Sequence, residues 1–302
     1  MSFTSAPLPG SRPTTMSGNM MLMAAMMTWA ASFPAADVLL KGGWDPLFLI
    51  NIRYVVALAI LVPLWIYADG LRSVIHAKWG KAIWIGGIAF GVGAYLLIVA
   101  QALTEPVIVA IIASAMPVAA TVIEVIHRQR RLTRTFAFGL CATVAGGVIA
   151  AGATPAPNLG WGVLAASVAT IVFAWGSNAT VKELPNMSTM GRTTVTFSGA
   201  AIVMTVIAMA ASGMGYAVIP ETIVSPQNAA MLGIYAIFGL VISQNLWLAG
   251  VSKLGIALAS FHINTAPFYV MIFMCALGAG WSWPQAIGAA VVGMGVLVAQ
   301  RG

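Results

Sequence analysis

Residues 46–67, PLFLINIRYVVALAILVPLWIY, decide the fold class, because they form an apolar run that carries a single charge, Arg53. A helix needs about 20 such residues to cross a hydrocarbon core of about 30 Å. Every backbone N–H and C=O inside a bilayer must find its partner within the protein, and a helix provides these partners locally. The run therefore predicts a transmembrane helix.

Nine further runs of this kind fill most of the chain, so we expect an all-α membrane protein with ten transmembrane helices. Each run has about 20 residues and at most one or two charges. The predicted spans are Gly18–Leu40, Pro46–Tyr67, Lys81–Leu103, Pro106–Ile126, Thr133–Ala151, Trp161–Leu184, Met187–Ala211, Asn228–Val251, Gly255–Leu277 and Trp283–Gln300.

The composition agrees with this class. Hydrophobic residues make up 60% of the 302-residue chain and charged residues 7%, whereas soluble domains are about 25% charged. Cys141 and Cys275 both fall inside predicted spans, so no disulfide framework is expected. The net charge of +7 does not indicate nucleic-acid binding, because the basic residues lie in short loops between spans.

The distribution of basic residues predicts the orientation in the membrane. If the spans alternate, one side holds Arg12, Arg72, Lys78, Lys81, Arg128, Arg130, Arg131, Arg134, Lys182, Lys253 and Arg301. The other side holds Lys41, together with Asp45, Glu105 and Glu221. Cytoplasmic loops are enriched in Lys and Arg, so both termini are predicted to be cytoplasmic. Nine more spans follow the first, which we therefore interpret as a retained helix and not as a cleaved signal peptide.

Three features recur at nearly one offset along the chain. The matched pairs are Trp29 and Trp175, Pro117 and Pro267, and Arg53 and Arg192, which lie 146, 150 and 139 residues apart. The pattern predicts two five-helix repeats, and since five is odd, the second repeat must insert upside down. Such inverted repeats are a frequent architecture of secondary transporters. The predicted domains are a cytoplasmic tail (1–17), a first repeat (18–153) and a second repeat (154–302).

These residues carry a family resemblance. Four features resemble the drug/metabolite transporter superfamily: Trp175-Gly-Ser-Asn-Ala-Thr-Val-Lys182, a degenerate Trp29-Ala-Ala-Ser-Phe-Pro, and a proline in the fourth span of each half, in Ala115-Met-Pro117 and Thr265-Ala-Pro267. The chain is similar to its EamA-like ten-span exporters over residues 18–300, and most resembles the aromatic amino acid exporters. The resemblance implies a secondary transporter that exports amino acids or similar metabolites from a bacterial inner membrane by alternating access.

The sequence departs from the family pattern at two places. Ala36 stands where the second half has Lys182. The acidic residue that follows the fourth span in the family matches Glu124, but the corresponding position in the second half is Met274. A mechanism that depends on paired carboxylates is therefore not expected.

A polar side chain inside a span is costly, and by default it faces a partner or a water-filled cavity. Binding pockets combine aromatic walls with a few fixed polar groups. On these grounds the predicted cavity residues are Trp29, Phe33, Tyr95, Gln101, Trp175, Asn178, Gln244, Trp247, His262 and Asn264. The resemblance implies that spans 1, 3, 4, 6, 8 and 9 line this cavity. Packing or lipid contact is the alternative for the aromatic members, and a hydrogen bond to a neighbouring helix is the alternative for His262.

Two prolines and four charged residues complete the candidates. Pro117 and Pro267 each delete a helical hydrogen bond and are predicted hinges. Arg53 and Arg192 either extend toward the headgroups or pair across the repeat interface. Each of the two embedded carboxylates, Asp37 and Glu124, has a basic residue four positions later, which favours a local ion pair. With no carboxylate in the middle third of a span, we expect transport down the substrate gradient, or weak proton coupling through His262.

The sequence contains no nucleotide-binding loop, metal-ligand spacing or hydrolase motif. We therefore expect no enzymatic activity, no cofactor and no metal. The expected partners are a small-molecule substrate and the bilayer, and the small-residue spacing in spans 5 and 10 does not by itself establish a homodimer. Alternatives are an exporter of other metabolites or drugs, a nucleotide-sugar or phosphate exchanger of the same superfamily, an intramembrane enzyme or flippase, and an ion channel. The exchanger needs Lys or Arg at the midplane, and none is expected there.

Overall fold

The computed structural model describes residues 12–119, 122, 133–151, 158–216, 225–254, 259 and 261–300, and their regular secondary structure is entirely helical. The first half contains α1 (Arg12–Lys41), α2 (Pro46–Asp69), α3 (Leu71–Ile75), α4 (Trp79–Ile85), η1 (Gly86–Val92), α5 (Gly93–Leu103), α6 (Pro106–Ala113) and α8 (Arg134–Ala151). The second half contains α9 (Leu159–Glu183), α10 (Thr189–Gly213), α11 (Pro226–Gly233), η2 (Ile234–Ile242), α12 (Ser243–Leu254), η3 (Phe261–Thr265), α14 (Ala266–Ala276) and α15 (Trp283–Gln300).

Length and composition make six helical stretches in the described chain capable of crossing a membrane. They are Met16–Lys41, Pro46–Asp69, Trp79–Leu103, Leu159–Thr180, Thr189–Gly213 and Pro226–Trp247. The other four predicted spans correspond to the shorter apolar helices Pro106–Ala119, Arg134–Ala150, His262–Ala276 and Trp283–Val298. The count of ten therefore stays a prediction, and so does the orientation of the termini. Residues 154–157, at the start of the predicted second repeat, lie outside the described residues, and so do Glu124, Arg128, Arg130, Arg131, Glu221 and Arg301.

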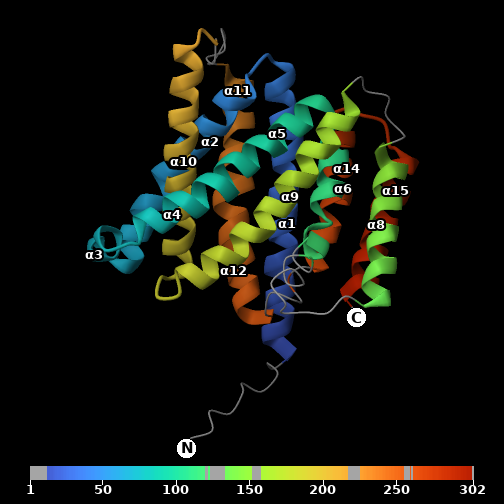
Figure 1. Cartoon of the computed structure of the whole chain (residues 1–302), viewed down its shortest axis with the longest axis horizontal. Coiled ribbons are helices and arrows are strands. Elements are labelled where there is room, and N and C mark those ends of the chain that lie inside the picture. The colour runs from blue at the N-terminus through green and yellow to red at the C-terminus, as the bar shows by residue number, and fades with distance from the viewer. Residues whose placement is uncertain are drawn as a thin grey trace, which may run out of the picture.

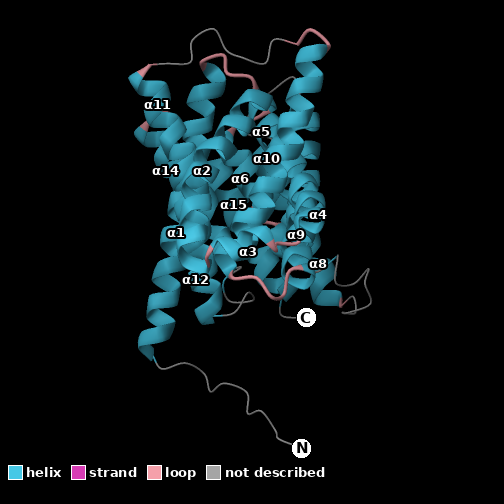
Figure 2. Cartoon of the chain, turned by 90° about the vertical axis from the view of Figure 1, so that its left-hand side faces the viewer, coloured by secondary structure: helices cyan, strands magenta, loops and turns pink. Residues whose placement is uncertain are grey.

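The two halves interleave in one bundle. In Figure 1, α1 lies near the middle, and it packs against α12, η2 and α14 of the second half. The tilted path formed by α4, η1 and α5 packs against α9 and α10. The first turn of α1 and the last turn of α15 lie at the same end of the bundle (Figures 1 and 2). The interface between the two halves is therefore extensive, and residues from both halves line a cavity at the centre.

The start of α2 fixes the depth of Arg53. The carboxylate of Asp45 accepts hydrogen bonds from the backbone N–H groups of Leu47 (2.7 Å) and Phe48 (3.3 Å), and Pro46 occupies the first helical position. This is a strong N-terminal signal, because a capping carboxylate satisfies free donors and proline has none to lose. Arg53 lies seven residues after Pro46, which places it about 10 Å along the helix at 1.5 Å per residue.

Two π-helical segments, η1 and η2, occupy corresponding places in the third and eighth spans. Each contains a Phe-Gly pair, Phe90-Gly91 and Phe238-Gly239, at an offset of 148 residues. A Cβ on Gly239 would lie 2.2 Å from the Cβ of Ser32 in α1, so glycine is required for this close approach. Segments of this kind are frequent at functional sites. The shared feature favours the predicted duplication, although the inverted arrangement itself stays a prediction.

Helices α8 and α15 pack along each other at one edge of the bundle (Figure 1). A Cβ on Gly146 would lie 2.8 Å from the carbonyl oxygen of Gly288, so these backbones approach closely, as small residues permit in lipid. On the outer side of α8, Phe138 and Val148 expose 68% and 65% of their surface. Large apolar side chains with such high exposed fractions are typical of a lipid-facing surface.

Candidate functional site

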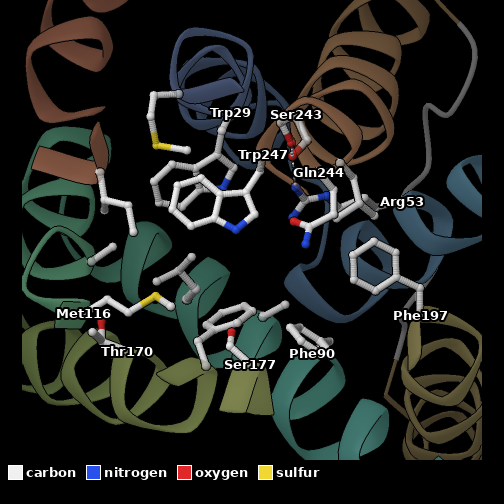
Figure 3. A pocket seen from close by; sticks show the side chains of 18 of the residues that line it. Trp29, Arg53, Phe90, Met116, Thr170, Ser177, Phe197, Ser243, Gln244 and Trp247 are labelled. Carbon is white, nitrogen blue, oxygen red and sulfur yellow. Dashed lines mark hydrogen bonds between the residues drawn. The ribbon is translucent and has the colours of Figure 1, made fainter. Parts of the chain in front are cut away.

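A central cavity of about 160 Å³ lies between the two halves of the bundle (Figure 3). Spans 1, 3, 4, 6, 8 and 9 each contribute a lining residue: for example Trp29, Phe90, Met116, Ser177, Trp247 and Ile263. Spans 2 and 7 also contribute, through Arg53, Tyr54 and Phe197. The volume is comparable to that of an engineered protein cavity of about 150 Å³ that binds benzene, so one aromatic ring fits.

The walls of the cavity are mainly aromatic. Phe90 packs edge-on against Phe197, with ring centroids 5.6 Å apart, and lies 5.8 Å from the ring of Phe173. Trp29 and Trp247 project into the cavity from the opposite side (Figure 3). Aromatic rings offer a large contact area with few rotatable bonds, so this wall suits a flat apolar group.

Arg53 is the charged side chain among the described lining residues. Its residue is only 8% exposed, and one terminal nitrogen (Nη2) donates a hydrogen bond of 3.1 Å to the carbonyl oxygen of Gly239. The guanidinium carbon (Cζ) lies 4.1 Å from the centre of the Tyr235 ring, which gives a cation–π contact. Arg53 therefore does not extend to the headgroups. Arg53 lines the cavity about 10 Å along α2, and the expectation that no Lys or Arg lies at the midplane stays a prediction.

Adjacent residues of α2 contact both π segments. Arg53 donates to the carbonyl of Gly239 in η2, and the hydroxyl of Tyr54 donates to the carbonyl of Phe90 in η1. Side-chain donors at these carbonyls satisfy backbone acceptors inside a membrane protein, where water does not do so. The second span therefore holds the third and eighth spans at the cavity wall.

Arg192, the predicted counterpart of Arg53, has a different environment. It lies in the first turn of α10, and its guanidinium donates hydrogen bonds of 2.7 Å to the carbonyls of Leu184 and Pro185. These bonds hold the loop between α9 and α10. The two arginines match in sequence, but one lines the cavity and the other stabilises a loop.

Hydroxyl and amide groups complete the lining. Ser243 donates to the carbonyl of Gly239 (2.9 Å), and Thr170 donates to the carbonyl of Ala166 (2.8 Å). Gln244 lies beside Arg53 with its amide toward the cavity, and Ser177 faces it from α9 (Figure 3). None of the described lining residues carries a carboxylate. The described lining thus holds one fixed positive charge in a mostly apolar wall.

Three of the ten predicted cavity residues, Trp29, Gln244 and Trp247, line the central cavity. Phe33 and Gln101 line a second cavity of about 20 Å³, together with Trp29 and Arg53. Gln101 is 4% exposed, and its amide donates a hydrogen bond of 2.7 Å to the carbonyl of Phe33. Gln101 therefore connects α5 to α1 beside the main site.

The remaining predicted residues line neither of these two cavities. Tyr95 packs at the junction of two hydrophobic clusters. On α9, the cavity face holds Thr170, Phe173 and Ser177. Trp175 precedes Ser177 by two residues, a rotation of about 200° at 3.6 residues per turn, so Trp175 points away from the cavity, while Asn178 is turned by about 100°.

His262 and Asn264 flank Ile263, which does line the cavity. Both residues are half-buried, and the Nδ1 atom of His262 and the Oδ1 atom of Asn264 are buried without hydrogen-bond partners. The hydroxyl of Thr265 donates to the carbonyl of His262 (2.7 Å). Asn264 faces Gly293 of α15. Neither His262 nor Asn264 is among the described lining residues of the cavity.

A break in the helix lies beside each predicted hinge proline. Helix α6 ends at Ala113, a turn follows, and the helical path resumes at Met116, directly before Pro117. In the ninth span the 3-10 segment η3 precedes α14, in which Pro267 is the second residue. Helices α6 and α14 pack against each other. The breaks bring Met116 and Ile263 to the cavity.

The lining residues that the sequence did not single out are mostly apolar. They include Met26, Tyr54, Phe90, Phe173 and Phe197. Only their helical face distinguishes them from ordinary core residues, and no single-sequence pattern gives that face in a helix that is apolar all round. The repeated Phe-Gly pair, which recurs at nearly the offset of the other matches, could have indicated Phe90 and Gly239.

Residues 16–151 match the model of the EamA-like transporter family. No curated protein matches the chain. Sixteen chains of solved structures match, and one of them, described as "Crystal structure of protein", has a TM-score of 0.67 at 20% identity. That match covers 94% of this chain and 97% of the other. At this identity the likeness shows the fold alone.

The family match bears on the first half of the chain. The matched residues 16–151 extend from the first turns of α1 to the end of α8. The resemblance to EamA-like proteins of the drug/metabolite transporter superfamily is therefore supported for this region. The narrower resemblance to aromatic amino acid exporters stays a prediction.

Proposed function

We propose that this protein is a secondary transporter that exports amino acids with aromatic or other hydrophobic side chains across a bacterial inner membrane. The observation that carries the proposal is the central cavity, which has the volume for one aromatic ring and is built from both halves of the chain. The EamA-like match of residues 16–151 supports transport of a small molecule. Alternating access follows from the same proposal, because Met116 and Ile263 reach the cavity beside helix breaks.

A small phosphate ester is the second candidate, because Arg53 lines the cavity and arginine binds phosphate well. A nucleotide sugar has several rings, which exceed a cavity of about 160 Å³. The phosphate-type exchanger therefore remains an alternative only for a compact substrate.

The test is counterflow in proteoliposomes that are preloaded with one amino acid and supplied with the same labelled compound. We expect exchange of phenylalanine, tyrosine and leucine well above empty liposomes, and little exchange of glutamate or lysine. A panel in which the hydrophobic amino acids give no exchange above empty liposomes contradicts the proposal.

A pair of variants on α9 links transport to the cavity. Ser177→Trp places an indole in the lining, so exchange is expected to fall to background. Val168→Trp changes a residue of the same helix that is 38% exposed, so exchange is expected to persist. Equal exchange by both variants assigns transport to some other path.

A further inference from the structure

The side chain of Arg53 is deeply buried, and its hydrogen-bond donors are not all paired. The residue is 8% exposed, and its Nε atom is buried without a hydrogen-bond partner. The ion pairs among the described residues are Lys41 with Asp37 and Lys81 with Glu183, and neither involves Arg53. A buried charge without an opposite charge is costly, so its persistence points to a partner that is bound part of the time.

The contacts of Arg53 fix its position without neutralising it. A neutral backbone carbonyl accepts from one terminal nitrogen, and the Tyr235 ring covers the guanidinium face. Arg53 borders the cavity, and Gln244 lies next to it there (Figure 3). The Nε–H group has no hydrogen-bond partner, and a planar guanidinium is suited to receive the two oxygens of a carboxylate.

The other lining residues indicate what the uncharged part of the ligand is like. The aromatic wall formed by Trp29, Phe90, Phe197 and Trp247 suits one flat apolar group. None of the described lining residues carries a carboxylate that could pair with an ammonium group. The charge balance of the cavity therefore favours recognition of an anion.

We infer that Arg53 binds the carboxylate of the transported molecule, and that the site selects compact aromatic or hydrophobic carboxylates whether or not they carry an α-ammonium group. This inference rests on the proposed function, since it assumes that the cavity holds the transported molecule. It assigns substrate recognition to the one cationic residue among the described lining residues.

The first test changes the ligand and uses the wild-type protein. Binding in detergent is followed by intrinsic tryptophan fluorescence, to which Trp29 and Trp247 in the cavity lining contribute. Four ligands are compared: L-phenylalanine, L-phenylalaninamide, 3-phenylpropanoate and 3-phenylpropanamide. We expect the two acids to bind with similar Kd values and each amide to bind at least ~10-fold more weakly than its acid. Amides that bind as tightly as the acids overturn the inference.

The second test changes the protein. Arg53→Met is expected to weaken binding of both acids at least ~10-fold and to leave the amides unchanged, while Arg53→Lys retains part of the affinity as a point charge. Arg192→Met is the matched control, because it also removes an arginine that donates to backbone carbonyls, but away from the cavity. If Arg53→Met and Arg192→Met bind the acids equally well, the inference is overturned. If Arg53→Met does not fold, the comparison of acids with amides still decides.

The outcomes separate this inference from the proposed function. Binding of 3-phenylpropanoate that depends on Arg53, without exchange of any amino acid, supports the inference and rejects amino acids as the substrate. If amino acids are exchanged, and their amides, which lack the carboxylate, are exchanged equally well, export is supported and the inference is overturned. Phenyl phosphate that binds at least ~10-fold more tightly than 3-phenylpropanoate also overturns it, because phosphate is then the recognised group.

Discussion

Trp247 and Trp175 are both half-buried tryptophans of the second half, but only Trp247 lines the cavity. We expect Trp247→Leu to weaken the affinity for an aromatic substrate about tenfold, because it removes an aromatic contact of about 0.5–1.5 kcal/mol as well as buried area. Trp175→Leu is the matched control, with an expected change below about threefold. Substrate titrations in detergent measure both, and an equal loss in the two variants contradicts the cavity assignment.

Gly239 shows why one missing side chain matters at the cavity wall. A Cβ there would lie 2.2 Å from the Ser32 Cβ and 3.5 Å from Nη2 of Arg53. We expect Gly239→Ala to lower the free energy of unfolding by about 1–3 kcal/mol, as overpacking does, and to disturb substrate binding.

Gly233→Ala is the control for that substitution, since a Cβ at Gly233 has no neighbour within 4 Å. Alanine favours a helix over glycine, so this variant is expected to keep or raise the Tm. Thermal unfolding in detergent compares the two variants. A Gly239→Ala protein as stable as Gly233→Ala would show that the contact of η2 with α1 adjusts without cost.

At the scale of elements, the fourth and ninth spans are interrupted beside Pro117 and Pro267, and their helices α6 and α14 pack against each other. We expect the double variant Pro117→Ala/Pro267→Ala to slow exchange at least ~10-fold while the substrate Kd changes little. The reason is that alanine restores the backbone donors and favours continuous helices, which removes the hinges of the alternating-access proposal.

Pro63 provides the control for the hinge prediction, because it lies within α2 and does not line the cavity. Pro63→Ala is expected to leave the rate of exchange within about twofold of wild type. Exchange rates come from counterflow and Kd values from fluorescence. Normal exchange by the double variant would exclude these prolines as hinges.

At the scale of the whole molecule, the start of α1 and the end of α15 lie at the same end of the bundle (Figure 2). We predict that this end is cytoplasmic, because the Lys and Arg residues concentrate in the loops on that side of the predicted topology. Reporter fusions at each terminus measure the location. A periplasmic signal from either fusion would reverse or break the predicted topology.

The energy source is also a property of the whole molecule. No carboxylate lines the cavity in the part of the chain that the structure describes, and Asp37 pairs with Lys41 at 2.8 Å. We therefore expect exchange and efflux to depend little on an imposed pH gradient, or to lose that dependence in His262→Gln. Efflux from proteoliposomes with and without a pH gradient measures this. If efflux depends strongly on the pH gradient in His262→Gln as well, this expectation is wrong, and Asp37 or Glu124 becomes the candidate for proton coupling.

The sequence by itself determined the class of the protein and most helix boundaries. Helix α2 starts at Pro46, as its apolar run predicts, because the signals are local: a capping carboxylate at Asp45 and a proline at the first position. The length of an apolar run relates directly to the thickness of a bilayer. The match of residues 16–151 likewise agrees with a resemblance first drawn from short motifs.

Only the tertiary structure decided which faces of these helices form the site. Trp29, Gln244 and Trp247 were predicted and line the cavity, whereas Trp175 and Asn178 are turned away from it. Arg53 had two interpretations, and the structure places it in the cavity wall against Gly239. The physical reason is that a membrane helix is apolar on its lipid side and on its packed side. The periodicity that identifies the buried face of a soluble helix is therefore absent, and side-chain direction depends on which neighbouring helices it meets.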